Sequence, residues 1–240
     1  MKAFIENPEL LINEFNEMAA IAQRKAFITV GIEIQKAEIE IINNYLNELT
    51  DLKKEFVARK LENEANLIFC LGNSLRVLQC ELEMLIYLKE DKMAEAWDKL
   101  VDAQAIFGNV IRNYPFETNS LAGYQQRLSD YEKLLFPKLF FQSVGGIIKK
   151  SQCSLCNDDY DKCDHIKGKL YMGEMCCRII VEQTLEEVSL VENPANKHCR
   201  VLTIKSNGKT VDIMTLREKS TTANSKLTGK SGFSTSLAGN

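Results

Sequence analysis

The stretch Ile68-Phe-Cys-Leu-Gly-Asn-Ser-Leu-Arg-Val-Leu-Gln-Cys-Glu-Leu-Glu-Met-Leu85 decides the fold of the first half of the chain. Its large aliphatic residues recur in steps of 3, 4, 3, 4 and 3, the spacing of a helix that buries one continuous stripe. We expect a long, coiled-coil-like helix, packed either within its own chain or against a second copy. This leucine seam comprises Ile68, Leu71, Leu75, Leu78, Leu82 and Leu85.

Other amphipathic helices are predicted on both sides of the seam. Asn7 before Pro8 provides an N-cap and a first helical residue, so one helix should run from there toward Gln23. Further helices are expected at about 93–112 and 120–135. Four or five such helices with short connections predict an antiparallel bundle.

The helix between these segments should occupy residues 32–49 and end at a turn formed by Thr50 and Asp51. Its inward stripe is predicted from the positions of its apolar residues. That stripe consists of Ile34, Ala37, Ile41, Tyr45 and Leu49.

Composition and termini bound the class of protein. The 240 residues are 45% apolar and 26% charged, which suits one or two globular cores. Glu6 and Glu9 occupy the region where a signal peptide would be basic and then apolar, and the apolar stretch 134–148 is too short to span a bilayer. We therefore expect a cytoplasmic protein with no membrane partner.

Charge is distributed unevenly along the chain. Residues 1–137 contain 15 basic and 22 acidic residues, a net charge of −7, whereas residues 197–240 contain 8 and 2, a net charge of +6. Isolated lysines without interleaved aromatic residues are a weak signal for nucleic acid binding. We favour protein partners, with a homo-oligomer or a larger assembly expected, and keep nucleic acid as an alternative.

The clearest chemical signal is a run of cysteines beginning with Cys153-Ser-Leu-Cys156. It continues with Cys163-Asp-His165 and the pair Cys176-Cys177, so that six of the eight cysteines and both histidines fall between residues 153 and 199. Two thiolates in a C-x2-C turn, joined by two further ligands from a second turn, match the tetrahedral site that zinc prefers.

The candidate ligands are not equally constrained by the pattern. A structural zinc site is favoured over a catalytic one, because a thiolate-rich closed set leaves no coordination position for water. Cys176 or Cys177 competes with the second turn for the fourth position. The candidate metal ligands are therefore Cys153, Cys156, Cys163, His165 and Cys176, with Cys177 as the alternative to Cys176.

Strand-like segments follow the cysteines. Runs at 178–181, 187–191 and 200–204 are rich in aliphatic residues, and Asn207-Gly208 suits a hairpin turn. The fold class predicted is α+β, and we expect four regions. These are an α-helical bundle at 1–142, a linker at 143–150, a small zinc-stapled antiparallel β module at 151–216, and a low-complexity flexible tail at 217–240.

Part of the region 150–205 resembles a known family. The segment Leu185-Glu-Glu-Val-Ser-Leu-Val-Glu-Asn-Pro-Ala-Asn196 is similar to the end of the protease domain in tailed-phage prohead proteases. The segment Cys163-Asp-His-Ile-Lys-Gly-Lys-Leu-Tyr-Met-Gly173 is similar to zinc-decorated variants of it. The resemblance does not extend to the catalytic residues, since neither Ser189 nor His165 matches the family's nucleophile or histidine.

These observations predict a protein that is not an enzyme. The resemblance implies a structural or assembly component of a phage particle, present in the host cytoplasm or the virion, and the cysteines add a structural zinc ion. Two alternatives stay open: a diverged hydrolase similar to prohead proteases, and a zinc protein that binds nucleic acid.

Overall fold

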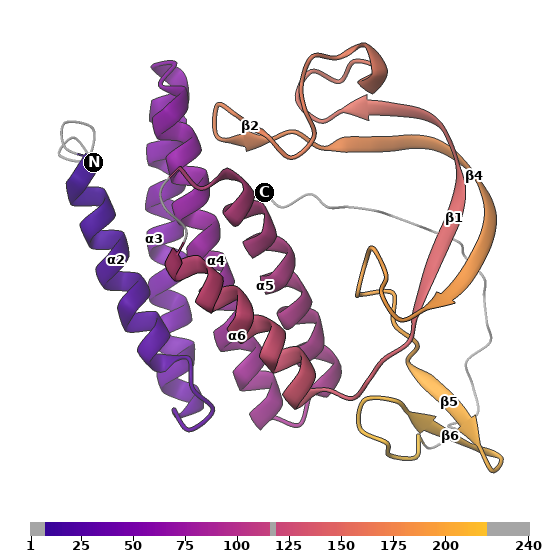
Figure 1. The fold of residues 1–240 in the computed structure, drawn as a ribbon. Helices are drawn as coiled ribbons and strands as arrows, with labels where there is room; N and C mark the ends of the chain where they lie inside the picture. Colours follow the sequence, from indigo (N-terminus) through magenta and orange to yellow (C-terminus); the bar gives the residue numbers. More distant parts are fainter. Residues whose placement is uncertain (1–7, 116–118, 220–240) are drawn as a thin grey trace.

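The computed structural model of the protein describes residues 8–115 and 119–219. It confirms an α+β fold, with the helices first and three two-stranded antiparallel sheets after them (Figure 1). The helices are α2 (Pro8–Lys25), α3 (Ile32–Ala58), α4 (Glu62–Lys89), α5 (Met93–Asn113) and α6 (Asn119–Leu135). The strands are β1 (Phe141–Cys153), β2 (Leu170–Tyr171), β3 (Glu174–Met175), β4 (Arg178–Val191), β5 (Thr203–Ser206) and β6 (Lys209–Asp212), with one 3-10 turn, η1 (Tyr160–Lys162).

Helix α4 is the centre of the helical bundle. It packs against α3 and α5, and every residue of the leucine seam has 3% or less of its surface exposed. The seam is therefore filled by contacts within the chain, as the first of the two interpretations predicted. It leaves no apolar stripe on α4 for a coiled coil with another chain.

The buried stripe of α3 differs from the predicted one. Ile34 and Ile41 are about half exposed, at 53% and 48%, whereas Gln35 and Glu38 are fully buried. Their polar atoms have partners at the turn between α2 and α3: the Gln35 amide donates to the carbonyl oxygens of Lys25 and Phe27, and the Lys25 ammonium lies 2.5 Å from a Glu38 carboxylate oxygen. Tertiary partners bind the Gln35 amide and one Glu38 oxygen, while the other Glu38 oxygen is buried without a partner; two polar residues thus take core positions that an apolar pattern assigns elsewhere.

The predicted turn at Thr50 and Asp51 is also wrong. Helix α3 continues to Ala58, and the chain reverses at residues 59–61 instead. Leu52 and Phe56 extend the buried stripe one turn at a time beyond Leu49, so that burial outweighs the weaker helix propensity of Thr and Asp. The next reversal lies between Lys89, the last residue of α4, and Met93, the first residue of α5.

Residues 143–150, expected as a linker, form the middle of a long β ribbon. Strand β1 pairs antiparallel with β4, and three bulges bend the pair into an arch (Figure 1). One bulge lies at Gly146, where a Cβ atom would come within 2.3 Å of the Thr184 carbonyl oxygen. The aliphatic runs 178–181 and 187–191 belong to the single strand β4, because the bulges absorb the irregular residues between them.

The base of the ribbon joins the bundle around Trp97. This side chain is 2% exposed, packs edge-on against Phe136 and stacks near Phe141, and its indole N–H donates to the Lys197 carbonyl oxygen at 3.1 Å. Ile213 and Met214, next to the confirmed β5–β6 hairpin, belong to the same buried cluster. The chain therefore leaves the bundle at Phe141 and returns to it about 60 residues later.

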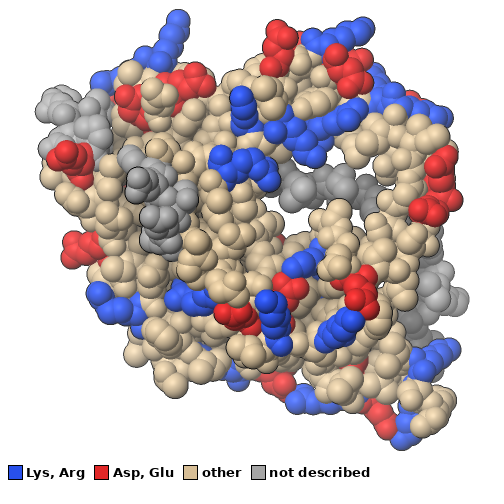
Figure 2. Space-filling model, viewed as in Figure 1, with Lys and Arg blue, Asp and Glu red and all other residues tan. Residues whose placement is uncertain are grey.

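The tip of the ribbon touches the other end of the bundle. The β2–β3 hairpin turns through Met172 and Gly173, both with positive φ, as a tight turn of the primed type requires. Asn66 accepts a hydrogen bond from the Gly173 N–H at 2.7 Å, and Lys53 pairs with Glu174 at 2.6 Å. The ribbon is thus anchored at both ends, and the space-filling view shows the molecule hollowed between bundle and ribbon (Figure 2).

Two sequence-based expectations concern the ends of the chain and its relation to membranes. Within the described residues, no helix combines the length and apolarity that crossing a bilayer would require. Of the predicted tail, residues 217–219 follow β6, with Lys219 pairing to Asp212 at 3.0 Å, and residues 220–240 lie outside the described part. The division into a bundle at 1–142 and a β module at 151–216 stays a prediction.

Candidate metal centre

The first pair of candidate ligands lies where β1 ends. Cys153 is the last residue of the strand and is fully buried; its N–H donates to the Asp158 carbonyl oxygen at 2.9 Å, and its carbonyl accepts from Asn157 at 3.0 Å. Asn157 adopts a positive φ of 62°, which lets the chain reverse within four residues. This closed turn brings the Cys156 thiol to the same side as that of Cys153.

The second pair comes from the segment after η1. Asp159 caps this 3-10 turn by accepting from the Asp161 N–H, and the turn delivers Cys163 and His165 toward the first pair. The His165 N–H points at the Cys163 sulfur at 3.2 Å, as the Leu155 N–H points at the Cys153 sulfur at 3.4 Å. Backbone donors of this kind stabilise a thiolate in each turn.

The donor atoms of Cys153, Cys156, Cys163 and His165 all lie within 4.8 Å of one another. The Cys156 and Cys163 sulfurs are 3.5 Å apart, and His165 Nδ1 is 3.1 Å from the Cys163 sulfur and 3.7 Å from the Cys153 sulfur. A tetrahedral ion with zinc–sulfur bonds of about 2.3 Å would separate its sulfur ligands by about 3.8 Å. The four side chains thus form a cluster that could hold a metal ion, and three cysteines with one histidine are compatible with zinc.

The pKa values of the Cys153 and Cys156 thiols also favour a bound metal ion. Burial opposes ionisation of Cys153, but the N–H groups of Cys156 and Leu155 outweigh it and lower its pKa to about 6. The Asp158 N–H favours the Cys156 thiolate, yet burial and the neighbouring Cys163 and Cys153 raise its pKa to about 11. Thiols this close ionise together only when a cation lies between them, and a divalent ion would supply that charge.

Cys176 and Cys177 lie beside this cluster and outside it. The Cys176 sulfur is 3.8 Å from that of Cys153, but Cys176 is not part of the group whose donor atoms all lie within 4.8 Å of one another. Burial and the neighbouring Cys153 raise the pKa of Cys176 to about 11, as high as that of Cys156, so ionisation does not distinguish these two thiols. The Cys177 N–H donates to the Ser154 hydroxyl at 2.8 Å, and the Cys177 carbonyl oxygen accepts from the Ser154 N–H at 3.0 Å. The group of four contains His165 and not Cys176, and the identity of the fourth ligand stays a prediction.

Substitution of the two competing residues should separate these assignments. We expect Cys176→Ala to retain about one zinc per chain, and His165→Ala to weaken zinc binding at least about 100-fold, because a direct ligand contributes more than an outer contact. Chelator competition measures both affinities, and cobalt substitution reports the number of sulfur ligands from its charge-transfer absorption. Loss of zinc in Cys176→Ala with retention in His165→Ala would reverse the assignment.

Two tyrosines that the sequence pattern did not single out shape the second pair. The Tyr160 hydroxyl accepts from the Lys167 N–H and the Tyr171 hydroxyl from the Ile166 N–H, both at 2.9 Å. The ring of Tyr171 also meets the edge of His165, with ring centres 4.7 Å apart. Their position within ten residues of the ligands is the only signal that the sequence offers for this role.

The remaining cysteines and the second histidine take no part in the cluster. Cys70 and Cys80 are buried in α4, where desolvation raises the pKa of their thiols to about 11 and 12. His198 lies at the base of the ribbon, 3.3 Å from an Asp98 oxygen and 3.1 Å from an Asp102 oxygen. Within the described residues, the cluster at the tip of the ribbon is the one group of such side chains that could hold a metal.

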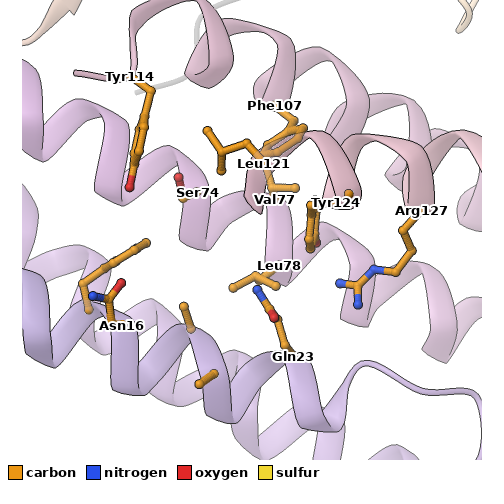
Figure 3. Close-up of a pocket in the computed structure, with 14 residues that line it drawn as sticks. Asn16, Gln23, Ser74, Val77, Leu78, Phe107, Tyr114, Leu121, Tyr124 and Arg127 are labelled. Carbon is orange, nitrogen blue, oxygen red and sulfur yellow. The ribbon is translucent and has the colours of Figure 1, made fainter. Parts of the chain in front are cut away.

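The bundle contains a separate cavity of about 420 Å³ between α2, α4, α5 and α6. Figure 3 shows Tyr124 and Arg127 at one side of it and Asn16 and Gln23 at the opposite side. Two of these lining residues bind Glu81, which is fully buried: it accepts from Arg127 at 2.8 Å and from the Tyr124 hydroxyl. Burial raises the pKa of Glu81 even though Arg127 opposes it. The ion pair explains how a charged residue is accommodated among the buried residues of α4, next to the leucine seam.

Comparison with known proteins does not assign this chain to a family. Neither a protein-family model, nor a curated protein, nor a solved structure matches it.

Proposed function

We propose that this chain is a non-enzymatic structural or assembly protein in which a zinc ion fastens the tip of the β ribbon. On the resemblance of residues 150–205, we further propose that it is a component of a phage particle, located in the host cytoplasm or the virion. Its partners are then other proteins of the particle or further copies of the same chain.

The composition of the metal cluster carries this proposal. Three thiols and one imidazole complete a tetrahedral shell, so no position is left for a water or substrate molecule. No large apolar side chain is buried between residues 153 and 178; the buried residues there are Cys153, Gly168, Gly173 and Cys176. A bound metal ion can hold together a segment that lacks a buried apolar core.

Two features favour assembly over the alternative functions. Ser189 pairs with Ser143 near the base of the ribbon, whereas His165 belongs to the cluster at its tip, which gives no serine–histidine pair to support hydrolysis. Glu182, Glu186 and Glu187 follow one another along β4, and their carboxylates would repel a phosphate backbone. An exposed ribbon is instead a common surface for protein partners.

Metal analysis tests the proposal directly. Protein purified without added metal should contain about one zinc per chain, and Cys153→Ser combined with Cys156→Ser should contain none. Cys70→Ser, in the bundle, is the matched control and should keep its zinc. A wild-type protein free of metal, or a double variant with unchanged metal content, would contradict the proposal.

A further inference from the structure

The cavity between α2, α4, α5 and α6, which we call the bundle cavity, is larger than a packing defect. Its volume is about 420 Å³, whereas voids in close-packed protein interiors are seldom larger than a water molecule. Pockets that bind small molecules have volumes of about 300–1,000 Å³. The exposed residues of its lining all lie on α2 or α6, so it opens to solvent between these two helices. A small molecule can therefore enter it without unfolding the bundle.

Gly123 keeps space open at one wall of the bundle cavity. It lies within α6, and a Cβ atom added to it would contact no neighbouring segment within 4 Å. Arg127 is one helical turn further along the same face and also lines the cavity. Glycine destabilises a helix interior relative to alanine, and no close neighbour requires it at this position. The helix thus contains a residue that lowers its stability and leaves room in the cavity, as occurs at functional sites.

Polar side chains gather at the two ends of the bundle cavity. Figure 3 shows Asn16, Ser74 and Tyr114 toward one end, and Gln23 and Arg127 toward the other. Gln23 follows Asn16 by two turns of α2, which is about 10 Å along the helix axis. Among the residues that the structure describes, the side-chain amides of Asn16 and Gln23 have no hydrogen-bond partner. Both amides are therefore available to a ligand.

The middle of the bundle cavity is apolar. Val77 and Leu78 of α4 and Phe107 of α5 line it and are buried, and Leu121 of α6 lines it as well. A volume of about 420 Å³ holds roughly 14 non-hydrogen atoms at about 30 Å³ each. A matching ligand has an apolar chain or ring between two polar groups that lie about 10 Å apart.

The charges around the bundle cavity indicate that the ligand is neutral. Arg127 is the one charged residue among the described residues that line it, and its Nη2 already donates to the Glu81 carboxylate at 2.8 Å. Its other terminal nitrogen, Nη1, has no hydrogen-bond partner in the described part of the chain. An anion bound there would lie close to Glu81, and the two negative charges would repel each other. A cation would face the guanidinium, whereas a neutral carbonyl oxygen accepts from Nη1 without either repulsion.

We propose that the bundle cavity binds an uncharged amphipathic small molecule with an amide or another carbonyl group at each end. The apolar middle of the ligand contacts Val77, Leu78 and Phe107. One carbonyl accepts from Nη1 of Arg127, beside the Gln23 amide, and the other end bonds to the Asn16 amide. This binding function goes beyond the proposed assembly role and does not depend on the zinc ion, because the cavity and the cysteine cluster share no residue.

Octanediamide is the probe that tests this inference, because a methylene chain joins its two neutral amides, which lie roughly 10 Å apart when extended. Added to the full chain with isotope-labelled methyl groups, it should shift the NMR signals of Val77, Leu78 and Leu121. We expect a dissociation constant on the order of 10⁻⁴–10⁻³ M. Octanedioate has the same length but two carboxylates, and it should bind at least about tenfold more weakly because Glu81 repels it.

Two leucine substitutions locate the binding site. Gly123→Leu fills the bundle cavity and should weaken octanediamide binding at least about tenfold, because the ligand and the new side chain need the same space. Gly108→Leu, in α5, is the matched control: a Cβ atom there also meets no neighbouring segment, but Gly108 does not line this cavity. The control should bind octanediamide as the wild type does. Urea unfolding shows that both variants are folded.

Gln23→Leu tests the polar contact at one end. It should weaken octanediamide binding about fivefold, through the loss of one hydrogen bond. No shift of the cavity methyl signals up to about 10 mM octanediamide would overturn the inference. Unchanged affinity in Gly123→Leu, or octanedioate that binds as tightly as octanediamide, would overturn it as well. None of these results bears on the zinc ion, which metal analysis measures separately.

Discussion

Removal of zinc should release residues 153–178 from the bundle while the helices remain folded. This segment buries no large apolar side chain, so four bonds to the proposed zinc ion would replace the core that a segment of its size otherwise needs. Structural zinc contributes on the order of 10 kcal/mol in small zinc-dependent folds. We expect backbone amides of this segment to exchange with solvent at least about 100-fold faster after chelation, as local unfolding predicts.

Hydrogen exchange followed by mass spectrometry measures this change segment by segment. Amides in α4, which is buried along its length, serve as the internal reference and should keep their protection. Restoring zinc should restore the slow exchange. The variant with Cys153→Ser and Cys156→Ser should resemble the chelated protein without any chelator. Equal protection of residues 153–178 before and after removal of the metal would contradict the assignment of a structural site.

Replacement of Arg127 by Met should destabilise the bundle by about 3–5 kcal/mol at neutral pH, because it leaves the Glu81 carboxylate buried without its charged partner. Figure 3 shows Arg127 beside Tyr124, and its guanidinium lies 4.4 Å from the centre of the Tyr124 ring. The loss therefore includes packing as well as charge. Urea unfolding followed by circular dichroism measures it.

The destabilisation by Arg127→Met should depend on pH with a defined sign. Burial already raises the pKa of Glu81 in the folded protein, and loss of Arg127 removes a group that lowers it. A carboxyl whose folded-state pKa exceeds its unfolded value stabilises the fold at low pH, and this contribution is lost as pH rises through the folded pKa. The variant should therefore approach the wild type as pH falls toward 5, within the range where the wild type stays folded.

A second variant separates charge from packing at this position. Arg127→Met combined with Glu81→Leu removes both charges and should recover most of the lost free energy of unfolding, since an apolar pair replaces a buried ion pair at little cost. If the double variant is as unstable as Arg127→Met alone, and neither depends on pH, then packing of the Arg127 side chain accounts for the effect.

The sequence predicts the helices and strands of this protein better than it predicts which of them pack or pair with one another. The helix around the leucine seam and the Asn207-Gly208 hairpin depend on patterns within a few residues, and both are found where expected. Gln35 and Glu38 are buried because of Lys25 and Phe27, which no pattern within α3 reveals. Pairing of β1 with β4 joins residues up to 50 positions apart, from Phe141 to Val191, and was likewise missed.

In the candidate metal centre, too, the contacts set by short spacing are predictable and the longer-range contacts are not. The spacing of Cys153, Cys156, Cys163 and His165 predicts that they meet, because two short turns bring them together. Cys176 could not be separated from them by spacing, since its distance from the cluster depends on the path of the chain through the β2–β3 hairpin that precedes it. The supporting roles of Tyr160 and Tyr171 likewise require the path of the loop.

The return of the chain to Trp97 has a consequence during synthesis. The indole N–H of Trp97 can form its hydrogen bond only after Lys197, 100 residues later in the chain, has been synthesised. Ile213 and Met214, which belong to the same buried cluster, are synthesised later still. At about 5–20 residues per second, that interval lasts roughly 5–20 s. During this time the side of the nascent helices around Trp97 is uncovered. A ribosome-bound chaperone has its longest opportunity to bind to that side.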